Sequence, residues 1–257
     1  MLADKRYERI VEITEKQGFV KTKELADLLR VSETTIRRDV EELDSRRRLI
    51  RVHGGAKSLA KGSLTTSEDE PLMRDRVTFH APEKEAIARR AADMVNDGDC
   101  VFLDGGTTIL PMVPFLKDKK ITIVTHSALV VEQFHGGNAR LFVLPGDYDT
   151  YFSMFTGPVT NTILSRFHFD LCFIGCLGVN VQEGTVLASE TVTPAIKRQA
   201  MEQANRRILM ADSSKMNIRA FYTMADIPEF DLVITDAAIR DVLPDDEIPE
   251  NFLVSES

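Results

Sequence analysis

The apolar side chains near the start of the chain recur at intervals of three and four residues, which is the spacing of amphipathic helices. This repeat predicts a helix over residues 5–16 that Gly18 ends. A second short helix is predicted to begin after Thr22, because threonine is an effective N-cap. Residues 30–32 then form a tight turn, so a third helix follows closely in the chain.

The third helix is expected to be capped by Ser32 and to bury one apolar stripe formed by Ile36, Val40 and Leu43. At 100° per residue, the side opposite that stripe carries three polar residues, Thr34, Arg37 and Arg38. A short helix, a tight turn and a second helix form a helix-turn-helix, whose second helix enters the DNA major groove. Arginine suits this task because it pairs with guanine and neutralises phosphate. The alternative is a solvated helix face that is paired with nearby carboxylates.

A basic ribbon follows the third helix. Residues 46–48 are three arginines, residues 49–52 have strand propensity, and residues 53–55 predict a turn with two glycines. Such a ribbon after a recognition helix is a wing, which contacts phosphates or places an arginine in the minor groove. The first 58 residues are therefore predicted to form a winged helix-turn-helix domain.

Beyond a polar linker at residues 59–78, apolar strands alternate with helices up to residue 235. Continuous apolar strands between helices predict a mostly parallel sheet covered on both faces, a Rossmann-like α/β domain over residues 79–257. The predicted helices include residues 82–96 and 193–204, and the predicted strands are residues 100–103, 121–125, 141–144, 171–174, 208–211 and 232–235.

Ligands of such sheets bind beyond the carboxyl ends of the strands. Residues 104–108 follow the first strand, with two glycines for close backbone approach, two threonine hydroxyls and the start of a predicted helix. They predict a phosphate cradle, and Lys215 after a later strand can add a positive charge. A plain strand-to-helix turn is the alternative.

Charge divides the chain in the same place as the linker. Of the 257 residues, the first 62 carry a net charge of +4 and the remainder carries −12. This asymmetry favours a small module that binds a polyanion, attached to a larger body that does not. The three cysteines lie in apolar runs without histidines at zinc spacing, so we expect reduced thiols and no metal or cofactor. We also expect a cytoplasmic protein without a membrane span.

Residues 22–29, 31–39 and 51–56, together with the loop at residues 104–108 and the run at residues 212–215, resemble the DeoR family of bacterial transcriptional regulators. The resemblance covers almost the whole chain. It implies an effector domain related in fold to ribose-5-phosphate isomerase, and phosphorylated sugars that release the regulator from its operator. Several positions depart from the family pattern, namely Arg47, Gly105, His126 and residues 146–147. The last three lie around the expected ligand, so the resemblance implies a sugar phosphate without naming it.

Residue chemistry and the resemblance together give two sets of candidate site residues. The candidate DNA-binding residues are Thr22, Ser32, Thr34, Thr35, Arg37, Arg38, Arg48, Arg51 and His53. The candidate effector-binding residues are Asp104, Gly105, Gly106, Thr107, Thr108, Thr125, Gly146, Gly175, Glu190, Lys197, Asp212 and Lys215.

The sequence thus predicts a transcriptional repressor that binds double-stranded operator DNA as a homodimer or homotetramer and senses a phosphorylated sugar. The alternative is a sugar-phosphate isomerase with an appended helical module. Isomerases of the related fold place carboxylates after the fourth strand, whereas residues 175–178 here contain none, so no catalytic residue is predicted. A helical module that binds proteins instead of DNA is a further alternative.

Overall fold

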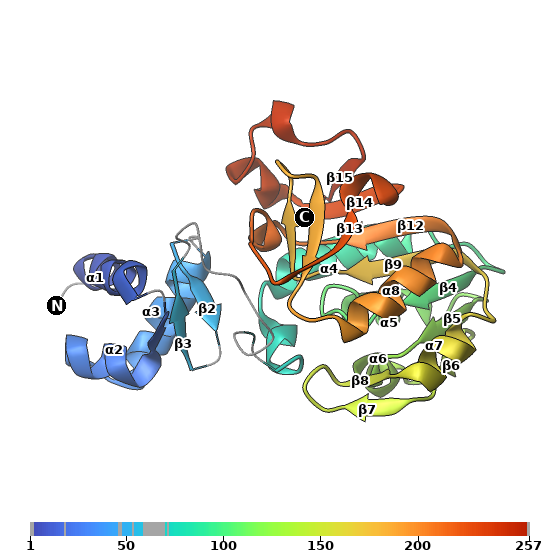
Figure 1. The fold of residues 1–257 in the computed structure, drawn as a ribbon, viewed down its shortest axis with the longest axis horizontal. Helices are drawn as coiled ribbons and strands as arrows, with labels where there is room; N and C mark the ends of the chain where they lie inside the picture. Colours follow the sequence, from blue (N-terminus) through green and yellow to red (C-terminus); the bar gives the residue numbers. More distant parts are fainter. Residues whose placement is uncertain are drawn as a thin grey trace. The chain divides into compact units, whose positions relative to one another are not determined.

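The computed structural model describes residues 3–17, 19–45, 48–52, 54–58, 70 and 72–255 (Figure 1). The chain forms two compact units, Met1–Pro71 and Leu72–Ser257. The second unit begins inside the stretch that the sequence predicted to be linker. Within that stretch Met73 is 6% exposed and packs into the core of the second unit, and Asp75–Thr78 forms a 3-10 helix.

The first unit packs three helices on a small antiparallel sheet with the strand order β1-β3-β2. Its elements are α1 (Ala3–Gln17), β1 (Phe19–Lys21), α2 (Thr22–Leu29), α3 (Glu33–Ser45), β2 (Ile50–Val52) and β3 (Gly55–Lys57). The predicted stripe of α3 is confirmed, because Ile36, Val40 and Leu43 lie in the core with Ile10 and Leu25. The helix-turn-helix and one strand of the wing were predicted correctly, whereas β1 and β3 were not predicted.

The two predicted helix caps have different outcomes. Ser32 caps α3 as predicted, since its Oγ accepts a hydrogen bond from the Thr35 amide at 3.2 Å. The prediction that Thr22 is an N-cap was wrong. Thr22 is the first residue of α2, its side chain is buried, and the cap residue Lys21 makes no side-chain cap bond. The Thr22 amide instead donates to the Gly54 carbonyl at 2.7 Å, so the start of α2 is tied to the wing.

The turn of the wing needs both of its glycines. Gly54 has φ of +77°, a left-handed conformation that a side chain disfavours. A Cβ at Gly55 would lie 2.2 Å from the Val20 carbonyl oxygen, so only glycine permits β1 to pair with β3.

The second unit is built on a seven-stranded parallel sheet with the order β15-β14-β12-β9-β4-β5-β6. These strands are β4 (Cys100–Leu103), β5 (Thr122–Thr125), β6 (Arg140–Val143), β9 (Phe169–Gly175), β12 (Ala204–Met210), β14 (Leu232–Asp236) and β15 (Phe252–Ser255). The α-helices are α4 (Ala81–Ala92), α5 (Val113–Leu116), α6 (Ala128–Gln133), α7 (Pro158–Leu164) and α8 (Val192–Glu202). The 3-10 helices after Thr78 are Leu110–Met112, Ser213–Lys215, Ile227–Glu229, Ala237–Asp241 and Asp245–Glu247.

Both faces of this sheet are covered, as predicted. Leu103 faces a core formed with α4, α5 and α6, whereas its neighbour Phe102 faces a second core formed with α7 and α8. This alternation explains why the strands read as continuous apolar runs. The predicted helix at residues 82–96 ends at Ala92, four residues early.

Several short strands were not predicted. β10 (Gly178–Asn180), β11 (Thr185–Ala188) and β13 (Tyr222–Asp226) form a small antiparallel sheet, and β7 (Asp147–Asp149) pairs with β8 (Met154–Thr156). β15 was also missed. In the described part of the chain, no helix is long and apolar enough to cross a membrane.

Candidate functional site

The outward face of α3 is the candidate DNA-reading surface. Thr34, Arg37 and Arg38 are exposed, as the helical periodicity predicted. Arg37 makes an ion pair with Glu33 at 3.6 Å, and the two side chains are 68% and 46% exposed. An exposed pair of this kind contributes little stability, so Arg37 can exchange Glu33 for a phosphate or a base.

The remaining DNA-binding candidates lie in different environments. Arg51 on β2 is partly buried and its Nη1 donates to the Glu41 carboxylate at 2.9 Å, which joins the wing to α3. Arg48 is exposed, as is Ser32, whereas the Thr22 side chain is buried at the start of α2. Thr35 lies at intermediate depth, with its hydroxyl 2.9 Å from that of Ser32. His53 lies outside the described residues.

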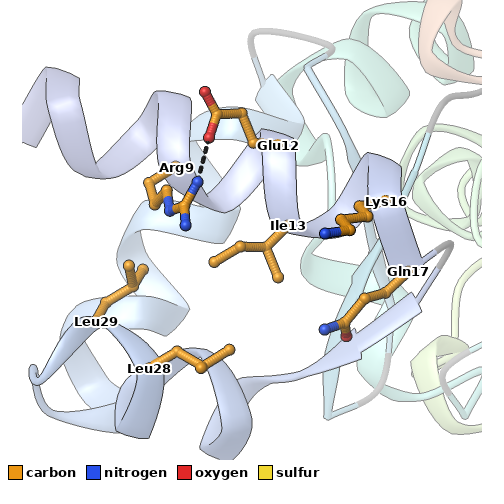
Figure 2. A pocket seen from close by; sticks show the side chains of 7 residues that line it. All are labelled: Arg9, Glu12, Ile13, Lys16, Gln17, Leu28 and Leu29. Carbon is orange, nitrogen blue, oxygen red and sulfur yellow. Dashed lines mark hydrogen bonds and ion pairs between the residues drawn. The ribbon is translucent and has the colours of Figure 1, made fainter.

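A hollow of about 350 Å³ is present elsewhere on the first unit, between α1 and α2. Figure 2 shows Ile13 of α1 opposite Leu28 and Leu29 of α2, with the Arg9–Glu12 ion pair at the rim. Lys16 and Gln17 complete the lining. None of these residues belongs to the α3 face, so the hollow is separate from the candidate DNA-reading surface.

The candidate effector site lies at the carboxyl ends of β4, β5, β9 and β12, which are adjacent in the sheet order β12-β9-β4-β5. The strands after β4 are added on one side of it, through β5 to β6 at one edge of the sheet. The strands after β9 are added on the opposite side, through β12 to β15 at the other edge. The position between β4 and β9 is therefore a topological switch point, where parallel sheets bind their ligands. Asp104 follows β4 at this position, and its Oδ2 accepts a hydrogen bond from the Gly175 amide at 2.9 Å.

Asp104 is fully buried and has three partners, Gly175 at the end of β9, His126 after β5 and Lys197 on α8. Its Oδ1 lies 3.2 Å from His126 Nε2, and its Oδ2 lies 3.3 Å from Lys197 Nζ. Lys197 also donates to the Gly175 carbonyl at 2.9 Å. Burial by itself raises the pKa of Asp104, but Lys197, His126 and the Gly175 amide outweigh burial and lower the pKa. Asp104 is therefore a charged group whose interactions organise the site.

Two lysines contact the threonines of the predicted cradle. Lys215 Nζ donates to Thr108 Oγ1 at 3.0 Å, and Lys84 Nζ donates to Thr107 Oγ1 at 2.9 Å. Asp212 lies 3.9 Å from Lys215, and its buried Oδ2 has no hydrogen-bond partner among the described residues. Although burial opposes ionisation, Lys215, the Ser214 hydroxyl and Lys84 lower the pKa of Asp212. The site thus offers hydroxyls and two lysine nitrogens to an anion, and Asp212 offers an acceptor to a hydroxyl.

Lys84 was not among the predicted site residues. Its side chain is 3% exposed, and burial followed by repulsion from Lys215 lowers the pKa of Lys84 from 10.5 to about 7. The sequence contained a signal, because Lys84, Ile87, Ala88 and Ala91 have the spacing of one buried helix face. A lysine at a buried helix position is rare without a partner or a function.

Other predicted effector residues have structural roles. The Thr125 hydroxyl is buried and donates to the Leu103 carbonyl at 2.7 Å. A Cβ at Gly146 would lie 2.0 Å from Thr160 Oγ1, so this glycine permits close packing. The Glu190 carboxylate accepts hydrogen bonds from amides at the start of α8, including the Thr193 amide at 3.1 Å.

Glycine also permits close contacts in the cradle itself. A Cβ at Gly105 would lie 2.2 Å from the end of the Met154 side chain, which would have to move. A Cβ at Gly106 would lie 3.4 Å from the Gly175 Cα, and a Cβ at Gly175 at the end of β9 would lie 3.4 Å from the Gly106 Cα. The helix expected after the cradle is present but short. A 3-10 turn with Pro111 comes first, and α5 contains only four residues, so the dipole is small.

In the described residues, neither the cysteines nor other possible metal ligands form a disulfide or a metal site. Cys100, Cys172 and Cys176 are free, and burial raises the pKa of Cys172 to about 12 and that of Cys176 to about 11. Within the same residues, no group of three or more His, Cys, Asp or Glu side chains is arranged to hold a metal ion.

Family models match both units. The DeoR-like helix-turn-helix domain matches residues 6–61, and the DeoR C-terminal sensor domain matches residues 79–237. The transcriptional regulator YulB of Bacillus subtilis is 33% identical over 240 residues, which are 93% of this chain and 91% of that protein.

Two further relatives are named as repressors. The transcriptional repressor AccR of Agrobacterium fabrum is 29% identical over 96% of this chain and 94% of its own. The lactose phosphotransferase system repressor of Staphylococcus epidermidis is 30% identical over 90% of this chain and 92% of its own. Among solved structures, ribose 5-phosphate isomerase A from Methanocaldococcus jannaschii matches 52% of this chain and 53% of its own chain. The TM-score is 0.37 and the sequence identity is 17%, so this likeness is too weak to support a functional argument.

Proposed function

Because this chain belongs to the DeoR family of transcriptional regulators, we propose that it represses genes of carbohydrate metabolism and leaves its operator when it binds a phosphorylated sugar. One observation carries the proposal: the basic groups Lys84 and Lys215 contact the two threonine hydroxyls of the switch-point loop. Ammonium and hydroxyl groups together suit a phosphate ester. The similarity to a lactose phosphotransferase system repressor supports a sugar-related role.

We assign DNA recognition to residues 1–58 and effector binding to residues 79–257, with residues 59–78 between them. One helix-turn-helix contacts only a few base pairs, so strong operator binding requires two copies on successive half-sites. The proposal therefore includes a homo-oligomer, a dimer or a tetramer, that acts on double-stranded DNA in the cytoplasm.

We expect Arg37→Ala and Arg38→Ala each to weaken operator binding by roughly 1–3 kcal/mol, because both side chains extend from α3 away from its buried stripe. Loss of a base contact should relax specificity at one position. Loss of a phosphate contact should weaken binding to all sequences and reduce the salt slope by about one unit. Fluorescence anisotropy titrations at two salt concentrations measure both effects.

Lys23→Ala is the matched control, since Lys23 is an exposed basic residue on α2, outside the α3 face. It should change operator affinity less than either arginine variant. Wild-type affinity for both arginine variants would reject α3 as the recognition helix.

We also expect the protein to bind a phosphorylated sugar at least about tenfold more tightly than the same sugar without phosphate, because the phosphate adds charge-assisted hydrogen bonds to lysines. Lys215→Ala should remove most of this preference, since Lys215 contacts the cradle through Thr108. Calorimetry with matched pairs of sugars and sugar phosphates measures the ratio. Equal affinity for both members of every pair would exclude a phosphate site.

An isomerase activity is not favoured by the same geometry. Asp104 is fully buried and its interactions lower its pKa, so it is a weak base for proton abstraction. The stretch after β9, residues 175–178, contains no carboxylate. Turnover of ribose 5-phosphate by the purified protein would contradict the non-enzymatic assignment.

A further inference from the structure

Lys84 joins two parts of the second unit that are far apart in the sequence. Its Nζ donates to the Arg76 carbonyl at 2.7 Å and to Thr107 Oγ1 at 2.9 Å. Arg76 lies in the 3-10 helix Asp75–Thr78, whereas Thr107 lies in the loop after β4. The two bonds fix the nitrogen beside the cradle.

The groups around Lys84 leave the site with an excess of positive charge. Lys215 and Arg76 repel its ammonium form, and Asp212 and Glu83 attract it. Asp212 also interacts with His80, the residue before α4. Two other buried carboxylates nearby already have partners, since Asp104 is paired with Lys197 and His126, and Asp236 accepts hydrogen bonds from Ser213. Asp212 is therefore the buried carboxylate that attracts both Lys84 and Lys215, so an added anion would be stabilised between these two lysines.

The hydrogen bonds indicate where that anion would lie. Lys84 and Lys215 contact consecutive threonines, Thr107 and Thr108, so both nitrogens are held against one short stretch of the loop. A neutral lysine amine has two N–H groups, which match its two acceptors, Arg76 and Thr107. A protonated ammonium has a third N–H that can point to a bound oxygen.

We propose that Lys84 is an effector-binding residue that holds the dianionic group of the ligand together with Lys215, and that it takes up a proton when the dianion binds. The proposal rests on the proposed function, because the ligand is the phosphate of the effector. Since burial and Lys215 lower the pKa of Lys84 to about 7, the free protein is largely unprotonated at Lys84 above this pH. A dianion favours the charged form, so its affinity should decrease as the pH rises from 7 to 9.

Sulfate is the probe, because it stays a dianion over this pH range and any proton taken up goes to the protein. Calorimetry of the full chain in two buffers of different ionisation enthalpy gives both the affinity and the number of protons. We expect wild type to take up close to one proton at pH 8.5. Lys84→Met should weaken sulfate binding about tenfold or more at pH 7 and abolish the uptake.

Two variants separate this role from packing. Lys119 also donates from Nζ to two backbone carbonyls, those of Ala92 and Val95, at 2.7 and 2.6 Å, so Lys119→Met removes a similar structural contact away from the cradle. It should retain wild-type sulfate affinity and proton uptake. Lys84→Arg keeps a charge that does not titrate near neutral pH, so it should bind sulfate without uptake and with little change in affinity from pH 7 to 9.

Circular dichroism checks the fold of each variant, and Lys84→Arg serves if Lys84→Met does not fold. Failure of wild type to bind sulfate, or proton uptake that persists in Lys84→Arg, would overturn the proposal for Lys84. Neither result rejects sugar-phosphate sensing, because the sugar pairs test that function separately.

Discussion

Replacing Asp104 by alanine is expected to lower the free energy of unfolding of the second unit by about 3–5 kcal/mol, the usual cost of breaking a buried ion pair. The change leaves the Lys197 ammonium, whose side chain is 9% exposed, without its carboxylate. It also removes the acceptor of the Gly175 amide, which is a buried donor. Urea denaturation of the full chain, followed by circular dichroism, measures the loss.

Asp104→Asn is the informative companion, because an amide oxygen can still accept the Gly175 hydrogen bond but carries no charge. Its loss of stability should be smaller than that of Asp104→Ala. If both variants unfolded at the same urea concentration as wild type, the ion pair would contribute nothing to the unit.

The lowered pKa of Asp104 also predicts how acid changes the stability of the second unit. The folded pKa of Asp104 is lowered, so the unfolded state binds the proton more readily. Its stabilisation is therefore fully present above the unfolded pKa of about 4 and is lost as the pH falls toward the folded value. The stability difference between wild type and Asp104→Asn should accordingly shrink below about pH 4.

Much of the candidate effector site could be predicted from the sequence, because one simple rule of sheet geometry determines where it lies. The carboxyl ends of parallel strands lie at one edge of a sheet, so residues just after apolar strands converge even when the strand order is unknown. Asp104, Gly175 and Asp212 were identified in this way. Which of them contact each other depends on the order β12-β9-β4-β5, and sequence periodicity does not contain that order.

The features that were missed depend on long-range contacts. The strands β10, β11 and β13 are short and pair across turns and distant segments, so no local alternation marks them. Lys84 lies in a helix that was predicted, but its partners Arg76 and Thr107 belong to other elements. Glu190 was predicted to bind the effector, and its hydrogen bond from the Thr193 amide at the start of α8 depends on local backbone geometry that the sequence pattern does not contain.

Asp39 is another example, with consequences for DNA binding. On α3 it belongs to the group of carboxylates that a solvated helix face would expose. In the structure it is 4% exposed, and Arg6 Nη2 of α1 donates to its Oδ1 at 2.9 Å while Arg6 Nε donates to Oδ2. This two-point contact joins α1 to the helix that carries Arg37 and Arg38.

We therefore expect Asp39→Ala to destabilise the first unit by about 3 kcal/mol or more, because the Arg6 guanidinium loses its buried partner. Small domains have little stability in reserve, so this loss should unfold an appreciable fraction of the unit and lower operator affinity at least about tenfold. Hydrogen exchange of α1 and α3 amides, measured alongside operator titration, tests both effects.

Glu33→Ala is the control, since it breaks the exposed Arg37–Glu33 pair at 3.6 Å and should cost less than about 1 kcal/mol. A double variant, Arg6→Met with Asp39→Leu, removes both charges and fills the space with apolar atoms. If the pair acts by fixing charge, this variant should recover much of the stability and the operator affinity that Asp39→Ala loses. Exchange rates and affinity that do not change in Asp39→Ala would show that α3 keeps its position without α1.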